Sequence, residues 1–316
     1  MILMFIDNLI DSIKEKNNPT VVGLDPKIEY IPEFIRKKHF EQAGVSLKAA
    51  GEAILEFNKA LIDSIYDIVP AVKPQSAYYE MYGIEGLKVL DETVRYAKSK
   101  GLLVILDGKR NDIGSTAEAY STAYLGTVKL NEETAVGAFD ADALTVNPYL
   151  GFDGIKPFID DCKKFNKGIF ILVKTSNKSS GQFQDILTSA GKSMYEVVAE
   201  HVEEWGRNVK GKYGYSSVGA VVGATYPNQA KILRQIMKSS YILVPGYGAQ
   251  GGTARDVVHS FNSDGLGAIV NASRSIMCAY QSETWKNEFK ETEFAQAGRA
   301  EAIRMRDDIN GALAVR

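Results

Sequence analysis

Short runs rich in β-branched and other apolar residues recur along the chain, and stretches with helical spacing separate them. Leu87, Leu90, Val94 and Ala97, for example, follow the three-and-four spacing of an amphipathic helix. Strand–helix alternation of this kind, repeated eight times, favours a parallel sheet that closes into a (β/α)8 TIM barrel of α/β class. An open doubly wound sheet is the alternative. The expected strands are residues 21–25, 71–73, 102–107, 143–147, 169–174, 218–222, 241–245 and 268–271.

The length of 316 residues exceeds what a minimal barrel needs. We interpret residues 1–316 as one catalytic barrel domain with extra helical segments. A charged segment at 27–44, a polar loop at 178–191 and a helical tail at 284–315 account for the excess. They are expected to be lids, oligomer contacts or an outer helix rather than a second domain.

The charge balance argues against polyanionic partners. The net charge is −2 and the pI is about 6.0, so no broad basic surface indicates nucleic acid or an anionic membrane. Cys162 and Cys278 lack the spacing of a zinc site, and a reduced, cytoplasmic protein is expected. Any anionic ligand must be held by a local cluster.

The N-terminal residues 1–6 are apolar but have no basic region before them. Asp7 and Asp11 follow almost at once, so the segment is not typical of a signal peptide. We expect it to form the first turn of a packed amphipathic helix. No apolar run approaches the length that spans a bilayer.

The third expected strand carries the most reactive pattern. It ends in Asp107-Gly-Lys109-Arg-Asn-Asp112, at the barrel face where active sites form. Two acids that flank one lysine keep it protonated, and a held ammonium suits proton donation to a carbanion. The alternative is a strand end with Asp112 or Ser115 capping the next helix and Lys109 in solvent.

A second cluster follows the seventh and eighth strands. Residues 245–252 are rich in glycine, so backbone N–H groups can approach an oxyanion. Thr253 can open a helix, and Arg274 follows the eighth strand. These two loops are the usual phosphate site of a barrel. A tight turn and a surface ion pair are the alternatives.

The motif from Asp107 to Asp112 resembles the Asp-x-Lys-x-x-Asp signature of orotidine 5'-phosphate decarboxylases. The block Pro245-Gly-Tyr-Gly-Ala-Gln-Gly-Gly is similar to the phosphate loop of that family. Three further blocks agree in order: Val22-Gly-Leu-Asp-Pro, Ala71-Val-Lys-Pro and Lys174-Thr-Ser-Asn. The resemblance extends from about 21 to 276, and the extra segments are similar to the longer variant of the family.

The resemblance implies roles for nine residues. Asp107, Lys109 and Asp112 would surround the scissile carboxylate, with Asp112 and Thr116 reaching into the site of a partner subunit in a homodimer. The expected substrate-binding residues are Asp25 and Lys73 for the ribose, with Lys73 also supporting Asp107, Ser176 for the pyrimidine, and Gln250 and Arg274 for the phosphate.

The implied reaction is decarboxylation of orotidine 5'-phosphate to UMP, without metal or cofactor. Lys109 would stabilise and protonate the C6 carbanion, and Asp107 would strain the ground state. The loop at 178–184 is the candidate lid over the phosphate. The resemblance assigns no role to Tyr247 or to the helical tail.

Three alternatives stay open. A Mg2+-dependent sugar-phosphate decarboxylase or synthase of the same barrel group would need a carboxylate where Lys73 stands. A Schiff-base aldolase would need a lysine of depressed pKa, which Asp107 and Asp112 oppose. A non-catalytic nucleotide binder would need the glycine loop and Arg274 but not the charged array.

Overall fold

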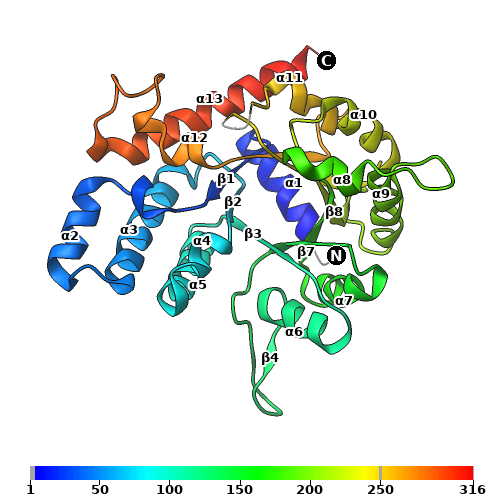
Figure 1. Ribbon diagram of the computed structural model, residues 1–316, viewed down its shortest axis with the longest axis horizontal. Coiled ribbons are helices and arrows are strands. Elements are labelled where there is room, and N and C mark those ends of the chain that lie inside the picture. The colour runs from blue at the N-terminus through cyan, green and yellow to red at the C-terminus, as the bar shows by residue number, and fades with distance from the viewer. Residues whose placement is uncertain (1–3, 249–250, 316) are drawn as a thin grey trace.

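Eight parallel strands close into a barrel in the computed structural model, which describes residues 4–248 and 251–315 (Figure 1). The last strand pairs with the first, which confirms the predicted (β/α)8 barrel and rules out the open sheet. In order around the barrel the strands are β1 (Thr20–Leu24), β2 (Ala71–Pro74), β3 (Leu103–Arg110), β6 (Ala143–Val146), β7 (Gly168–Lys174), β8 (Ser216–Val222), β9 (Ser240–Pro245) and β10 (Ala268–Ala272).

Helices surround the barrel. The longer ones are α2 (Glu33–Ala43), α3 (Leu47–Ile65), α5 (Gly83–Ser99), α6 (Gly114–Tyr124), α7 (Lys156–Phe165), α9 (Met194–Trp205), α10 (Pro227–Ile236) and α13 (Phe294–Ala314). Single turns and 3-10 turns are α4 (Ala77–Glu80), α8 (Gly181–Gln184), α11 (Ala254–Val257), α12 (Arg274–Met277), η1 (Ile28–Tyr30), η2 (Phe152–Gly154), η3 (Lys178–Ser180), η4 (Val258–Ser260), η5 (Ala279–Gln281) and η6 (Glu291–Glu293).

The three extra segments lie around this one barrel. The segment at 27–44 forms α2, which packs on α3, and the loop at 178–191 contains α8. The tail contains α13, which packs on α3, α11, α12 and β1 and so serves as the outer helix after β10 (Figure 1). None of the helices in the described parts of the chain is long and apolar enough to cross a membrane.

A small hairpin outside the barrel was not predicted. Strands β4 (Val128–Lys129) and β5 (Ala135–Val136) pair antiparallel beyond the end of α6 (Figure 1). Each strand has two residues, and a polar stretch joins them. Period-two alternation cannot be recognised in so short a run.

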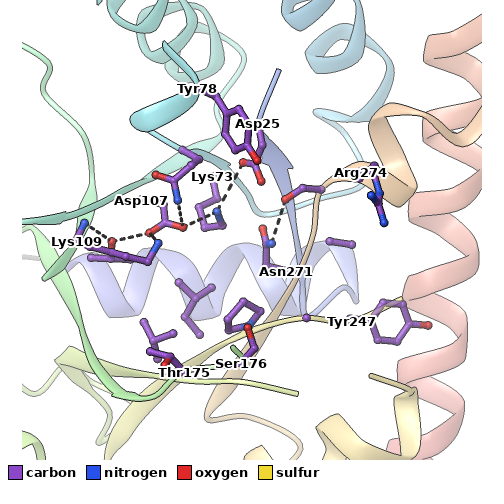
Figure 2. Close-up of a pocket in the computed structure, with 18 of the residues that line it drawn as sticks. Asp25, Lys73, Tyr78, Asp107, Lys109, Thr175, Ser176, Tyr247, Asn271 and Arg274 are labelled. Atoms are coloured by element: carbon purple, nitrogen blue, oxygen red, sulfur yellow. Dashed lines mark hydrogen bonds and ion pairs between the residues drawn. The ribbon is translucent and has the colours of Figure 1, made fainter. Parts of the chain in front are cut away.

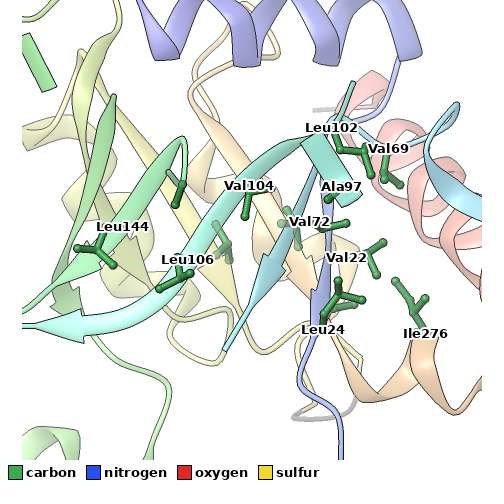
Figure 3. Close-up of a cluster of buried hydrophobic side chains, with 14 of the residues drawn as sticks. Val22, Leu24, Val69, Val72, Ala97, Leu102, Val104, Leu106, Leu144 and Ile276 are labelled. Carbon is green, nitrogen blue, oxygen red and sulfur yellow. The ribbon is translucent and has the colours of Figure 1, made fainter. Parts of the chain in front are cut away.

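The core has two layers, because alternate residues of a strand face opposite sides of the sheet. Val22, Val72, Val104 and Leu144 face outward and pack beneath the helices, as Figure 3 shows. Each fully buried side chain of this size contributes about 2 kcal/mol through burial alone.

The inner layer is closed by α1 (Phe5–Lys16). Its buried face packs into the barrel against inward-facing side chains such as Phe170. The rings of Phe5 and Phe170 meet edge to face, with centroids 6.3 Å apart. The predicted amphipathic helix is therefore present and begins at Phe5, while residues 1–3 lie outside the described part of the chain.

Candidate active site

Polar residues continue the inner face of four barrel strands. Ala71, Ile105, Ala143 and Ile269 lie in the apolar interior. Two positions further along each strand, on the same face, the residue is polar. These polar residues are Lys73 on β2, Asp107 on β3, Thr145 on β6 and Asn271 on β10. Strand alternation therefore places polar side chains inside the barrel at the carboxyl ends of these strands.

A cavity of about 590 Å3 opens at this end of the barrel, and all four polar residues line it (Figure 2). Asp25, Lys109, Ser176, Tyr247 and Arg274 line it as well. The structure thus brings six of the predicted site residues into one cavity, namely Asp25, Lys73, Asp107, Lys109, Ser176 and Arg274.

Asp107 is the centre of the charged array, because four side chains donate to it. Lys73 and Gln75 each lie 3.0 Å from Oδ2. Lys109 lies 2.6 Å and Thr145 2.8 Å from Oδ1. Figure 2 shows these contacts converging on the carboxylate. Both oxygens are fully engaged, which fixes Asp107 in one orientation.

The charges in the array stabilise one another. Burial alone would raise the pKa of Asp107, but the nearby Lys73 and Lys109 ammonium groups hold it well below its usual range. Burial would lower the pKa of Lys73, but Asp107 and the Asp25 carboxylate, 3.9 Å away, raise it. At neutral pH Asp107 and Lys73 are therefore both charged.

Lys109 has a strained backbone. Its φ is +48°, in the left-handed region that few side chains adopt. Its N–H donates to Thr145 Oγ1 at 2.9 Å, and the pairing of β3 with β6 shifts register between Leu106 and Arg110. This kink bends the side chain back to Asp107, so regular strand alternation alone does not account for the pair.

One carboxylate oxygen and one carboxamide oxygen in the cavity have no hydrogen-bond donor among the described residues. Asp25 Oδ1 and Asn271 Oδ1 are buried and accept no hydrogen bond from the described residues. The Asn271 amide nitrogen donates to Ser273 Oγ at 3.3 Å. A buried oxygen without a donor can accept a hydrogen bond from a ligand group in the cavity. Figure 2 places Asn271 between the Lys73 array and Arg274.

Arg274 opens α12 at the opposite end of the cavity from Lys109 (Figure 2). Its side chain is exposed, and its guanidinium forms no ion pair with the described residues. The fork is therefore free for an anion. Gly246 and Tyr247, from the loop after β9, also line the cavity, and Figure 2 shows Tyr247 on the same side of it as Arg274. Gln250, predicted to hold the phosphate, lies outside the described residues.

The helix predicted to open at Thr253 is a single turn, α11. Thr253 is its N-cap, and Asp256 in the first turn accepts from Thr253 N and Oγ1 at 2.8 and 2.6 Å. A one-turn helix with a carboxylate in its first turn offers little attraction for a phosphate. Of the residues predicted to bind phosphate, Arg274 is therefore the described one that lines the cavity.

Ser176 lies after β7, between Thr175 and Asn177, which also line the cavity. Gln184 on α8 holds this turn. Its side-chain oxygen accepts from Thr175 N at 3.0 Å, and its side-chain nitrogen donates to Thr175 Oγ1 at 2.8 Å. Residues 178–184 are not among the residues that line the cavity. Their assignment as a lid stays a prediction.

Asp112 and Thr116 lie outside the cavity of their own chain. Asp112 Oδ1 accepts from the N–H of Ile113 at 2.8 Å, and Thr116 is exposed on α6. Asp112 does not cap α6, because the N-cap is Ile113 and has no side-chain bond.

Sequence reasoning missed Gln75, Thr145 and Asn271 as parts of the site. The positions of Thr145 and Asn271 follow from strand parity, since both share a face with residues of the interior. Gln75 comes directly after β2 and forms a bridge with Asp107. In the parts of the chain that the structure describes, no group of three or more His, Cys, Asp or Glu side chains is placed to hold a metal ion.

Comparison with known proteins gives the same picture as the geometry. Residues 20–286 match the family model described as Orotidine 5'-phosphate decarboxylase / HUMPS family. A protein of Caldicellulosiruptor saccharolyticus named orotidine 5'-phosphate decarboxylase is 44% identical over 311 residues, covering 98% of this chain and 99% of that relative.

Solved structures of the same kind superpose on the fold. The OMP decarboxylase of Leishmania donovani has a TM-score of 0.73 and 29% identity, with 99% of both chains covered. The UMP synthase of the same organism has a TM-score of 0.74 and 30% identity, and this chain covers 57% of its length.

The barrel and its cavity define an enzyme of the (β/α)8 class, with a lysine–aspartate site at one end of the cavity and, at the other, an arginine that has no ion pair among the described residues. The chain belongs to the orotidine 5'-phosphate decarboxylase / HUMPS family.

Proposed function

We propose that the chain removes CO2 from orotidine 5'-phosphate and releases UMP, as a step of de novo pyrimidine synthesis. The observation that carries this proposal is the ionised array of Lys73, Asp107 and Lys109 at one end of the cavity, with Arg274 at the other. The name of the relatives that align over nearly the whole chain supports the same reaction.

The reaction needs a way to stabilise negative charge at C6. The bond between C6 and the carboxylate breaks, CO2 leaves, and the electron pair stays on C6. The Lys109 ammonium stabilises this carbanion and then gives it a proton, forming UMP and a neutral amine that regains a proton from water. Lys109 is suited to this because it is partly exposed to the cavity and fixed by Asp107 at 2.6 Å.

Asp107 has a second role in this proposal. Its low pKa keeps it negative beside the substrate carboxylate, which raises the energy of the bound substrate until CO2 leaves. Binding energy from remote parts of the substrate must offset that cost. The Arg274 guanidinium, at the far end of the cavity, would supply part of it through the phosphate.

The remaining contacts follow the shape of the nucleotide. Asp25 and Lys73 would bind ribose hydroxyls, and the buried Asp25 Oδ1, which accepts no hydrogen bond from the described residues, is available as an acceptor. Ser176 would bind the pyrimidine. Gln250 would join Arg274 at the phosphate.

We also propose that two copies of the chain form a homodimer in which Asp112 and Thr116 complete the partner's site. Both lie near the carboxyl end of the barrel but away from their own cavity. A large apolar side chain next to Asp112 is exposed, since Ile113 is 55% accessible. Exposed apolar surface next to unused site residues supports burial against a second copy.

The chemistry of the cavity favours this reaction over the Mg2+-dependent alternative. The Lys73 ammonium lies between Asp25 and Asp107, where a divalent cation would meet like charge. We therefore propose a reaction without metal or cofactor. The full chain would act as one catalytic domain in the cytoplasm, where free thiols such as buried Cys162 persist.

The test is an absorbance assay with orotidine 5'-phosphate and the purified chain in EDTA. The proposal expects loss of the substrate band and formation of UMP at an unchanged rate when Mg2+ is added. Activity that depends on Mg2+, or turnover of a keto-sugar phosphate instead, would favour the alternative enzyme. Binding of UMP with no turnover would leave only the nucleotide binder.

A further inference from the structure

Tyr247 connects the glycine loop after β9 to the last helix of the chain. It stands between Gly246 and Gly248, lines the cavity and is only 5% exposed. Its hydroxyl donates to Asp308 Oδ2 on α13 at 2.5 Å. Figure 2 shows the ring directed away from the charged array, toward the pink helix.

The backbone on both sides of Tyr247 is glycine. Gly246 and Gly248 have φ values of +99° and +70°, which glycine adopts at no steric cost but loses entropy to maintain. Within the described residues the loop amides bond mainly one another: Gly248 N donates to Gly252 O at 2.9 Å, and Gly252 N donates to Gly246 O at 3.1 Å. Tyr247 supplies a packed side chain between these two glycines.

Helix α13 offers a rigid attachment. Met305 and Ile309, one turn apart, are fully buried on either side of Asp308 in sequence. Asn310 donates to the backbone oxygen of Asn17 at 2.8 Å, and Arg299 pairs with Asp67 near the other end of the helix. Asp308 therefore holds a fixed position relative to the barrel.

The protonation states suit this contact. Burial raises the pKa of Tyr247, and the neighbouring Asp308 carboxylate raises it further. The phenol therefore stays neutral and donates to a charged acceptor, which makes a stronger hydrogen bond than a neutral pair.

We infer that Tyr247 and Asp308 form a positioning pair, through which α13 holds the backbone at 246–248 in the shape that accepts the substrate phosphate. Backbone that is ordered in advance does not lose that entropy again when the anion binds. The inference rests on the proposed function, since it assigns the phosphate to this end of the cavity. It gives the C-terminal helix a part in substrate affinity beyond packing.

The test compares ligands with and without the phosphate. In Tyr247→Phe and in Asp308→Asn, kcat/KM for orotidine 5'-phosphate should fall roughly tenfold through KM, because one charge-assisted hydrogen bond is lost. The kcat/KM for orotidine should not change. The double variant should be no worse than either single variant, since both remove the same contact. Asp307→Asn, the adjacent exposed carboxylate on α13, is the matched control and should behave as the wild type.

Equal losses with both substrates, additive losses in the double variant, or no loss at all would overturn the inference. If Tyr247→Phe folds poorly, Asp308→Asn carries the test, because its side chain lies at the surface. Calorimetry with UMP and uridine separates this inference from the proposed function. If the wild-type chain does not decarboxylate but the variants bind UMP more weakly, the positioning pair is supported and only the proposed function fails. If the wild-type chain is active but the variants bind UMP with unchanged affinity, the positioning pair is contradicted.

Discussion

The ammonium of Lys73 lies 3.0 Å from Oδ2 of Asp107, and both groups are buried beneath the cavity. A buried charge is tolerated only when it is paired, so each of these residues depends on the other for its ionised state. The pair connects the stability of the barrel to the chemistry proposed at Lys109.

Replacing Lys73 should therefore lower both the stability of the barrel and the rate of turnover. Lys73→Met leaves Asp107 with Lys109 as its only cation, and we expect the free energy of unfolding to fall by about 3 kcal/mol. Turnover should fall by more than roughly a hundredfold, because Asp107 loses a donor that orients it. Urea unfolding and the absorbance assay measure the two effects. Lys59→Met, on the outer face of α3, is the control, and an equal loss there would contradict the argument.

The depressed pKa of Asp107 predicts a specific acid response. Its folded-state pKa lies below the unfolded value of about 3.9. The group thus contributes stability that is fully present above that value and is lost as the pH falls through the folded pKa. In Asp107→Asn this contribution is absent at every pH.

Urea unfolding from pH 6 down to about pH 2 tests this response. The difference in unfolding free energy between the wild type and Asp107→Asn should be largest near neutral pH and should shrink below about pH 4. Two curves that stay parallel over the whole range would show that Asp107 titrates as an ordinary carboxyl group.

Arg274 should act on affinity and not on the chemical step. Its guanidinium has no ion pair among the described residues, so Arg274→Ala leaves no buried charge behind. We expect KM for orotidine 5'-phosphate to rise roughly ten- to a hundredfold, as for a lost charge-assisted contact. Steady-state kinetics measure this, with Arg255→Ala on α11 as the control. A loss confined to kcat would place Arg274 elsewhere in the mechanism.

The proposed exchange of Asp112 between subunits can be tested by complementation. Lys109→Ala and Asp112→Ala chains should each be inactive alone. Mixed dimers carry both defects in one site and neither defect in the other, so they should regain activity at one wild-type site per dimer. Verified heterodimers without activity would show that Asp112 acts within its own chain or not at all.

Much of the fold was predictable because the barrel repeats a local pattern. All eight barrel strands were predicted, with ends within about three residues of those observed, since β-branched runs mark them directly. Strand β3 differs most from the prediction, because it continues past Asp107 to Arg110. The left-handed backbone at Lys109 that produces this kink is stabilised by Thr145, 36 positions away, and no local propensity encodes it.

The candidate site was predictable where a residue carries charge in a motif. The site was not predictable where the role of a residue depends on its contacts in the folded chain. Asn271 is notable because its buried oxygen lacks a donor, a property of the folded cavity. Tyr247 meets Asp308 across 61 positions of sequence. Such contacts depend on how α13 packs on the barrel, which periodicity does not specify.

The central claim, that Lys109 stabilises and protonates the carbanion, is tested most directly with Lys109→Ala in the presence of EDTA. We expect the rate of CO2 release from orotidine 5'-phosphate to fall by at least roughly a thousandfold, because charge stabilisation and the proton donor are both lost. UMP should still bind, which shows that the cavity is intact. Decarboxylation at the wild-type rate by a folded Lys109→Ala enzyme would contradict the account.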